Sequence, residues 1–359
     1  MSLNSIDYFW IIFATCRAAV ISSAICDNFA GLLNSLPWEW RGAMSFDGKG
    51  GRFLMLSRIL LAGLTLAMVG ASVFRPKRRI APRSGEVYLD GDRLTVGNGV
   101  VLPAMRWPAK DEPRAVLLCL HAYGDYRRSF RLAGPWFAEQ GIEAIAYDQR
   151  GFGETGSRGT WPGAEMLIQD FADAVTAVRD RFPDRPLYVL GESMGASVAL
   201  SGLASGEAVD VDRLILAAPG VRGDLPLQQL HDSVLRLAAL ALPWLAMELR
   251  RGGRPWLDPS EAARLADDPL VLRELSVGTY EGLIDLATMA SASARGDLPP
   301  TLLLYGELDG TIPRRAVDDL ARSLDERDAT LYYPDRHHLL LHEVDAELTF
   351  KDCLSWLNS

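Results

Sequence analysis

The chain has 359 residues and a formal net charge of −9; 48% of its residues are hydrophobic and 23% are charged. These proportions are those of an ordinary globular protein, and the length allows one large domain or two modest ones. The acidic balance argues against a general nucleic-acid binder, because a surface that binds a polyanion needs clustered Lys and Arg. The dense basic run at residues 75–79 follows an apolar segment and is typical of a membrane flank.

Residues 1–80 form an apolar N-terminal region, in which residues 53–74 contain Arg58 as their only charged side chain. A bilayer core needs roughly 20 apolar residues, so we predict a membrane anchor here, with Arg58 reaching one interface. A cleaved export signal is an alternative, because residues 69–71 (Val-Gly-Ala) offer small side chains for a cleavage site. A buried helix of the main domain is a third possibility.

The basic residues on the two flanks of this segment bear on its orientation. Five follow it directly and favour a cytosolic catalytic domain by the positive-inside rule: Arg75, Lys77, Arg78, Arg79 and Arg83. Others precede or enter it and oppose that orientation: Arg41, Lys49, Arg52 and Arg58. We therefore expect a membrane-associated protein, and the exported alternative stays open.

From about residue 85 short apolar runs alternate with helical patterns. The predicted strands are residues 100–107, 115–120, 142–147, 187–190, 214–218, 301–305 and 330–333. The predicted helices are residues 127–140, 164–181, 193–203, 314–324 and 344–357. This alternation is typical of an α/β fold with a mostly parallel central sheet covered by helices, and ligands bind beyond the carboxyl ends of such strands.

Between residues 221 and 296 the alternation stops, and the pattern is largely helical without an obvious strand. The predicted helices here are residues 231–247, 259–266, 269–275 and 280–290. We predict an inserted helical cap at 221–296 and a core made of residues 81–220 and 297–359. Apolar cap residues such as Leu240 and Trp244 either line a substrate pocket or pack the cap on the sheet.

The motif Gly191-Glu-Ser193-Met-Gly195 follows a predicted strand and opens a predicted helix. That context is the one in which Gly-x-Ser-x-Gly forms a nucleophile elbow, a tight strained turn that exposes the serine hydroxyl. We therefore predict that Ser193 is a catalytic nucleophile.

A nucleophilic serine needs a base, and the base needs an acid that orients it, in the chain order Ser, Asp or Glu, His on this kind of sheet. Asp309 lies in the loop after the strand at 301–305, with Glu307 as a nearby competitor. The last strand leads to His337 and His338, and spacing alone does not separate them. His342 is expected on the following helix and is the least favoured base.

An oxyanion hole needs two backbone N–H groups aimed at the developing charge. Met194, directly after the nucleophile, supplies one, and Tyr123 in the loop after the strand at 115–120 is expected to supply the other. His121 in the same loop is predicted to be structural. The cysteines form no Cys-x-x-Cys pair, and Cys119 is predicted to be a buried thiol. We expect no metal and no organic cofactor.

These motifs resemble the monoacylglycerol lipase and lysophospholipase branch of the α/β-hydrolase superfamily over about residues 98–357. The family's His-Gly-x-Gly corresponds to residues 121–124, with Ala122 in place of the first glycine, and its Asp-x-x-Gly-x-Gly corresponds to residues 148–153. Its acid motif corresponds to Gly306 to Asp309 with Pro313. The family's catalytic histidine precedes apolar residues, which favours His338 over His337.

The resemblance implies a triad of Ser193, Asp309 and His338 beneath the cap, with Tyr123 and Met194 as oxyanion donors. It also implies hydrolysis of a mono-acyl lipid ester through an acyl-enzyme, a substrate that a membrane segment would suit. A carboxylesterase for small esters and an acyltransferase are alternatives on the same triad. A non-enzymatic binding protein on this fold is a further alternative, although such proteins usually lack part of the triad.

Overall fold

The computed structural model describes residues 85–359, except residues 209, 224–227, 250–253 and 294–296. The predicted N-terminal region, with its membrane anchor at 53–74, lies outside the described residues. Among the helices that are described, none is both long and apolar enough to cross a membrane.

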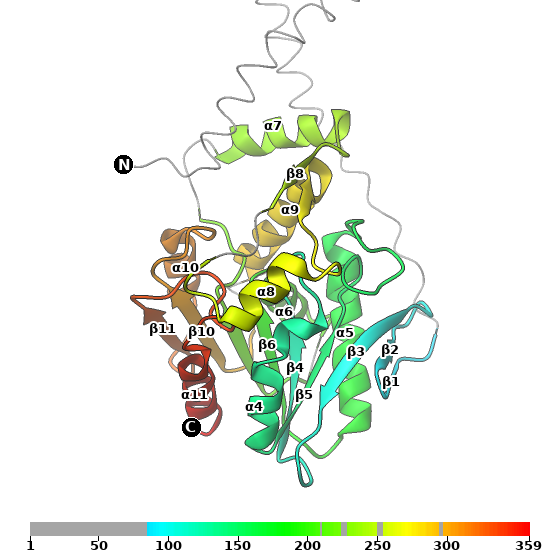
Figure 1. The fold of residues 1–359 in the computed structure, drawn as a ribbon, viewed down its shortest axis with the longest axis vertical. Coiled ribbons are helices and arrows are strands. Elements are labelled where there is room, and N and C mark those ends of the chain that lie inside the picture. Colours follow the sequence, from blue (N-terminus) through cyan, green and yellow to red (C-terminus); the bar gives the residue numbers. More distant parts are fainter. Residues whose placement is uncertain (1–84, 209, 224–227, 250–253, 294–296) are drawn as a thin grey trace, which may run out of the picture. The chain divides into compact units, whose positions relative to one another are not determined.

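The centre of the fold is a nine-stranded sheet with the order β1-β2-β3-β5-β4-β6-β7-β10-β11 (Figure 1). Its strands are β1 (Tyr88–Asp90), β2 (Arg93–Thr95), β3 (Val101–Trp107), β4 (Ala115–Leu120), β5 (Ile142–Tyr147), β6 (Leu187–Glu192), β7 (Arg213–Ala217), β10 (Thr301–Gly306) and β11 (Ala329–Tyr333). Within this sheet, the neighbouring strands β5, β4, β6, β7, β10 and β11 pair in parallel, and β1, β2 and β3 pair antiparallel with one another and with β5 at one edge. The predicted mostly parallel sheet is confirmed; β1 and β2, of three residues each, are too short to show a pattern in the sequence.

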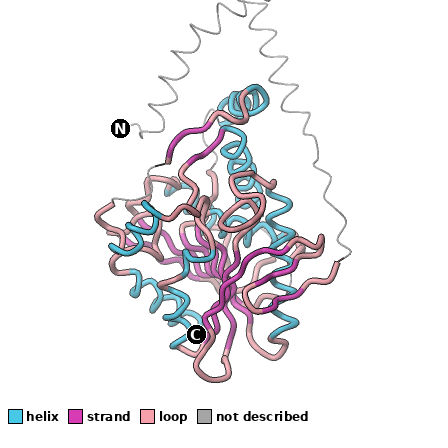
Figure 2. The backbone as a smooth tube through the Cα atoms, turned by 45° about the vertical axis from the view of Figure 1, so that its right-hand side comes forward, coloured by secondary structure: helices cyan, strands magenta, loops and turns pink. Residues whose placement is uncertain are grey.

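Helices cover both faces of this sheet, as Figures 1 and 2 show. They are the short 3₁₀ helix η1 (Arg127–Phe130), α4 (Ala133–Glu139), α5 (Ala164–Arg181), α6 (Met194–Ala204), α10 (Arg314–Ala321) and α11 (Ala346–Leu357). Alternate residues of β4 serve the two layers: Leu118 packs in the cluster of α5 and α6, whereas Leu117 packs in the cluster of α4 and α11. The prediction of a single helix at 127–140 is wrong, because two separate helices, η1 and α4, form there.

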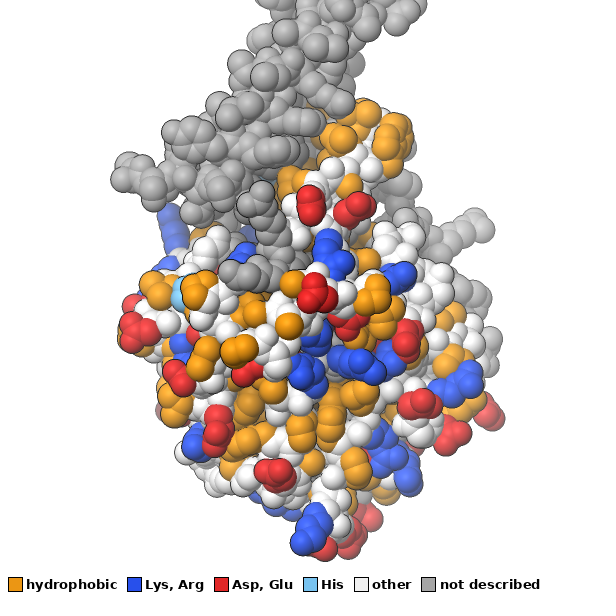
Figure 3. All heavy atoms as spheres, in the orientation of Figure 1, with side chains coloured by type: hydrophobic (Ala, Val, Ile, Leu, Met, Phe, Trp, Pro, Cys, Tyr) orange, Lys and Arg blue, Asp and Glu red, His pale blue; other side chains and the backbone are white. Residues whose placement is uncertain are grey.

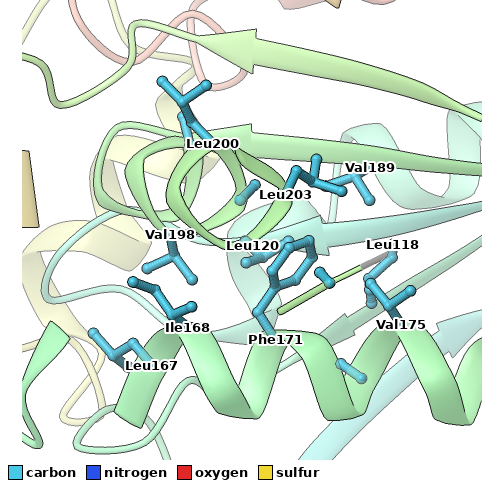
Figure 4. Packing of buried hydrophobic residues seen from close by; sticks show 14 of the residues in the cluster. Leu118, Leu120, Leu167, Ile168, Phe171, Val175, Val189, Val198, Leu200 and Leu203 are labelled. Carbon is cyan, nitrogen blue, oxygen red and sulfur yellow. The ribbon is translucent and has the colours of Figure 1, made fainter. Parts of the chain in front are cut away.

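The packing of α5 against α6 fixes the helix that follows Ser193. Phe171 of α5 lies among side chains of β4, β6 and α6 in one buried cluster (Figure 4). Gly202 of α6 allows this contact, because a Cβ there would lie 2.8 Å from the Phe171 ring. The close contact at Gly202 therefore packs the C-terminal half of α6 against α5.

The segment between β7 and β10 holds α7 (Gln228–Ala241), β8 (Ala246–Glu248), α8 (Pro259–Asp267), β9 (Glu274–Ser276) and α9 (Val277–Ser293). The segment is largely helical, as predicted, but β8 and β9 also form an antiparallel pair that the sequence did not indicate. The helix predicted at 231–247 ends at Ala241, two residues before Pro243, which lacks a backbone donor. Helix α8 ends before Asp268, which precedes a proline and is extended, with ψ 120°. The helix predicted at 269–275 does not form: residues 269–271 are turn and bend, and Glu274 begins β9.

Candidate active site

Ser193 occupies a strained turn between β6 and α6. Its φ of 51° and ψ of −110° are unusual for a residue with a side chain, and such conformations cost about 1–3 kcal/mol. A Cβ at Gly191 would lie 2.5 Å from Cα of Ala196, and one at Gly195 would lie 2.2 Å from the carbonyl oxygen of Leu120. The two motif glycines are therefore required by close backbone packing around the serine.

Ser193, His338 and Asp309 form a hydrogen-bonded row from three different loops. Oγ of Ser193 lies 2.9 Å from Nε2 of His338, and Nδ1 of His338 lies 2.7 Å from Oδ2 of Asp309. An ionised carboxylate only accepts, so Nδ1–H donates to Asp309 and leaves Nε2 to accept the serine proton. The Asp309 carboxylate is fully buried, which suits the orienting acid of a triad.

The loop that carries Asp309 (the acid loop) and the loop that carries His338 (the base loop) contact each other through backbone atoms. Leu308 donates its N–H to the carbonyl oxygen of Arg336 at 2.9 Å. A Cβ at Gly306 would lie 2.4 Å from the carbonyl oxygens of both Arg336 and His337, so only glycine allows this approach. Oδ1 of Asp309 also accepts two backbone N–H groups of its own turn, at 2.6 and 3.1 Å, which fixes the carboxylate toward the histidine.

The two residues that the sequence left as competitors point elsewhere. Glu307 forms an ion pair with Arg314 at 2.7 Å in solvent. The His337 ring stacks on Trp256, with centroids 4.3 Å apart and planes 6° apart, and its backbone N–H donates to Glu343 at 2.6 Å. Geometry therefore brings Asp309 and His338, and not their neighbours, to Ser193.

Met194, one of the two predicted oxyanion donors, directly follows Ser193 and is the first residue of α6, where backbone N–H groups have no acceptor within the helix. Tyr123 lies in the loop after β4, and its hydroxyl donates to the carbonyl oxygen of Glu274 in β9. Ala122 is not among the described residues with a positive φ, so this position does not need the backbone freedom of the family's glycine.

His121 is buried and holds two loops together. Its Nε2 accepts the backbone N–H of Gln149 at 3.0 Å, and its Nδ1 lies 2.8 Å from the carbonyl oxygen of Ala122. Burial lowers the pKa of this histidine, which keeps it neutral and able to accept that bond. These contacts agree with a structural residue. Cys119 is buried as predicted, and burial raises the pKa of its thiol.

The two cap residues predicted to touch substrate lie on the surface. Leu240 in α7 is 70% exposed and Trp244 is 73% exposed, and Figure 3 shows hydrophobic side chains gathered over this end of the cap. Neither residue packs the cap on the sheet, so that alternative is wrong for both. Their contact with substrate stays a prediction.

His342 is the charged residue that sequence reasoning placed wrongly. It lies in a turn before α11, rather than on it, and its ring is buried between Glu192 and Glu261 at 2.9 Å from each. Burial alone would lower its pKa, but the two carboxylates raise the pKa to about 10. The sequence around His342 does not indicate this contact, because Glu261 and Glu192 are 81 and 150 residues away from it along the chain.

This pKa yields a prediction for histidine titration. A raised pKa means that His342 is an imidazolium at pH 7; its contribution to stability is full below about pH 6.5 and is lost as pH rises through about 10. We expect one histidine in a ¹⁵N-histidine NMR spectrum to keep imidazolium shifts up to about pH 9. That signal should vanish in His342→Gln, and five neutral histidines at pH 8 in the wild type would contradict the prediction.

Within the described ranges, no group of three or more His, Cys, Asp or Glu side chains is arranged to hold a metal ion.

Comparison with known proteins agrees with this geometry. Residues 111–345 match the Hydrolase_4 family, described as serine aminopeptidase, S33. The monoacylglycerol lipase of Mycolicibacterium smegmatis is 25% identical over 258 residues, which are 70% of this chain and 91% of that protein. The mouse monoglyceride lipase is 25% identical over 268 residues, 72% of this chain and 86% of its own.

The fold is also shared with solved structures. A soluble variant of the monoglyceride lipase of Saccharomyces cerevisiae, in complex with a substrate analogue, superposes with a TM-score of 0.62. The two chains are 18% identical, and the match covers 79% of this chain and 97% of the yeast protein. At that identity the likeness shows the α/β-hydrolase fold.

Proposed function

The chain belongs to the Hydrolase_4 family, and on this premise we propose that it is a serine esterase that cleaves mono-acyl lipid esters. The observation that carries the proposal is the hydrogen-bonded row from Ser193 through His338 to the buried Asp309, at 2.9 and 2.7 Å. Elbow, base and acid come from three loops at the carboxyl ends of β6, β11 and β10, where parallel sheets place their active sites.

The proposed chemistry is acyl transfer to Ser193 and then to water. His338 takes the serine proton as Oγ attacks the ester carbonyl, and the backbone N–H groups of Met194 and Tyr123 hold the oxyanion. His338 returns the proton to the leaving alcohol, which departs and leaves an acyl-enzyme. Water, deprotonated by His338, releases the carboxylic acid and restores the serine. Asp309 keeps the imidazole in the required tautomer throughout.

The proposed substrate class rests on the relatives and on the surface of the cap. The mycobacterial and mouse relatives are named as lipases for monoacylglycerol or monoglyceride. The exposed Leu240 and Trp244 give the cap an apolar surface, which suits a substrate with a long acyl chain. In this proposal residues 221–296 form the cap, and residues 81–220 and 297–359 form the catalytic core.

We also propose that residues 53–74 anchor the enzyme to a membrane, where mono-acyl lipids reside. The support is the sequence itself: an apolar run with one charge, followed by a basic cluster that favours a cytosolic catalytic domain. An alkaline carbonate wash of membranes tests this proposal, because an integral anchor resists extraction.

A substrate panel tests the proposed function. We expect kcat/KM for a long-chain monoacylglycerol to exceed that for p-nitrophenyl acetate by about 10-fold or more, because each methylene buried in an apolar site adds about 0.8 kcal/mol. Lysophospholipids and an aminoacyl p-nitroanilide complete the panel. Faster turnover of the acetate would favour a small-ester carboxylesterase, and transfer to added glycerol in place of water would favour an acyltransferase. Cleavage of the anilide alone would contradict an esterase.

A further inference from the structure

A buried ion network joins helix α8 of the cap to the loops that carry the catalytic groups. We call this set the α8 network: Asp125, Arg131, Glu192, Glu261, Arg264 and His342. Its centre is Glu261, whose carboxylate accepts from Nδ1 of His342 at 2.9 Å and from Arg264 at 2.8 Å. Arg131 also donates to this carboxylate.

Each of three network residues lies next to a different part of the active site. Glu192 directly precedes Ser193 and accepts from Nε2 of His342 at 2.9 Å. His342 itself follows the proposed base by four residues in the same loop. Asp125 follows the proposed oxyanion donor Tyr123 by two residues and receives a bidentate pair from Arg264 at 2.6 and 2.7 Å.

Backbone hydrogen bonds tie both ends of α8 to the same loops. Asp258, the N-cap of α8, donates its N–H to the carbonyl oxygen of His342 at 2.9 Å. Beyond the C-terminal end, Leu272 donates its N–H to the carbonyl oxygen of Gly124 at 2.8 Å. The residues on either side of α8 therefore contact the loops that carry His338 and Tyr123 by main chain, and the helix contacts them by charge.

The side chains of the α8 network depend on one another, because they are buried and their charges balance. Three carboxylates (Asp125, Glu192 and Glu261) meet three cations (Arg131, Arg264 and the His342 imidazolium), and all but Arg131 are nearly inaccessible. Within the described residues, Oε1 of Glu192 has no hydrogen-bond partner, so His342 is what orients this carboxylate beside the elbow. Removing one charge leaves another uncompensated, and the loops it joined lose their common support.

We propose that Glu261 and Arg264 are positioning residues, through which helix α8 holds the nucleophile, base and oxyanion loops in register as a fixed part of the cap. The inference rests on the proposed function, because it assigns roles around that triad. Neither residue is placed against the reacting atoms, so both act through Glu192, His342 and Asp125. A displacement of about 1 Å between reacting groups costs on the order of 100-fold in rate.

The test compares Arg264→Gln and Glu261→Gln with wild type as full-length chains. At a temperature where thermal melts show all variants folded, we expect kcat and the rate constant for fluorophosphonate labelling to fall about 10- to 100-fold, with KM changed less than about threefold. The double variant should lose little more than the larger single loss, because both changes break one network. Arg264→Lys, which keeps the charge without the planar fork, should recover part of the activity.

Arg179→Gln is the matched control. Arg179 also pairs with a carboxylate, Asp212 at 2.6 Å, which itself accepts the backbone N–H of Leu187 at the opposite end of β6. Its labelling rate should stay within twofold of wild type. If Arg264→Gln fails to fold, Glu261→Gln, which keeps the side-chain volume, and Arg264→Lys carry the comparison.

The outcomes separate the two proposals. Folded Arg264→Gln and Glu261→Gln chains that label as fast as wild type, or that lose activity only through KM, would overturn the positioning role. A wild-type chain that does not label at all would instead overturn the proposed function.

Discussion

Ser193→Ala is expected to lower kcat for ester hydrolysis by about 10⁶-fold, while the fold and the melting temperature stay close to those of wild type. The hydroxyl is the atom that attacks the ester, and no other nucleophile occupies the elbow, whose φ of 51° presents this side chain to the base. Initial rates on a p-nitrophenyl ester, followed at high enzyme concentration, measure the loss.

Ser201→Ala is the matched control for this substitution. Ser201 lies on the same helix, α6, and its hydroxyl is buried without a hydrogen-bond partner among the described residues. Its loss should leave kcat within about twofold. A Ser193→Ala chain that retains a tenth of the wild-type rate would mean that another group attacks the ester.

Substitution of the adjacent histidines should produce opposite results. His338→Ala is expected to lower kcat by about 10⁴- to 10⁶-fold, because Nε2 of His338 is the base 2.9 Å from the serine hydroxyl. His337→Ala is expected to cost less than about 10-fold, because that ring stacks on Trp256 and takes no part in the triad row.

The two variants serve as controls for each other, since both remove a histidine side chain from the same loop. Steady-state kinetics on one soluble ester, with melts for both variants, make the comparison. A larger loss for His337→Ala than for His338→Ala would contradict the base assignment and the loop geometry that supports it.

The sheet was predictable because its strands are locally encoded. Strands β4 and β5 are buried along their whole length, so β4 appears in the sequence as a continuous apolar run and β5 as one interrupted only by Glu143. The elbow was predictable for a related reason. Its two glycines are required because a Cβ at either position would lie only 2.2 or 2.5 Å from a backbone atom.

The base was less predictable from residues alone. Two adjacent histidines follow β11, and the choice between them depends on how the loop turns over Gly306, a contact between strands that are adjacent in space. The family resemblance indicated His338, and the geometry brings that residue to Ser193.

The strands of the cap and the α8 network could not be predicted from the sequence, because contacts between residues far apart in the chain define them. The strands β8 and β9 have three residues each and pair across 25 intervening residues, so no local alternation marks them. His342 looked like a polar residue at a helix start, and its two carboxylate partners come from β6 and α8. A buried charge can be recognised only when its counter-charges are in place.

Fluorophosphonate labelling of the wild-type chain, read by intact mass and peptide mapping, tests the central claim most directly. We predict a single phosphonyl adduct on Ser193. A fully folded chain that takes no adduct, or one that takes it on a residue other than Ser193, would contradict the assignment of Ser193 as the nucleophile.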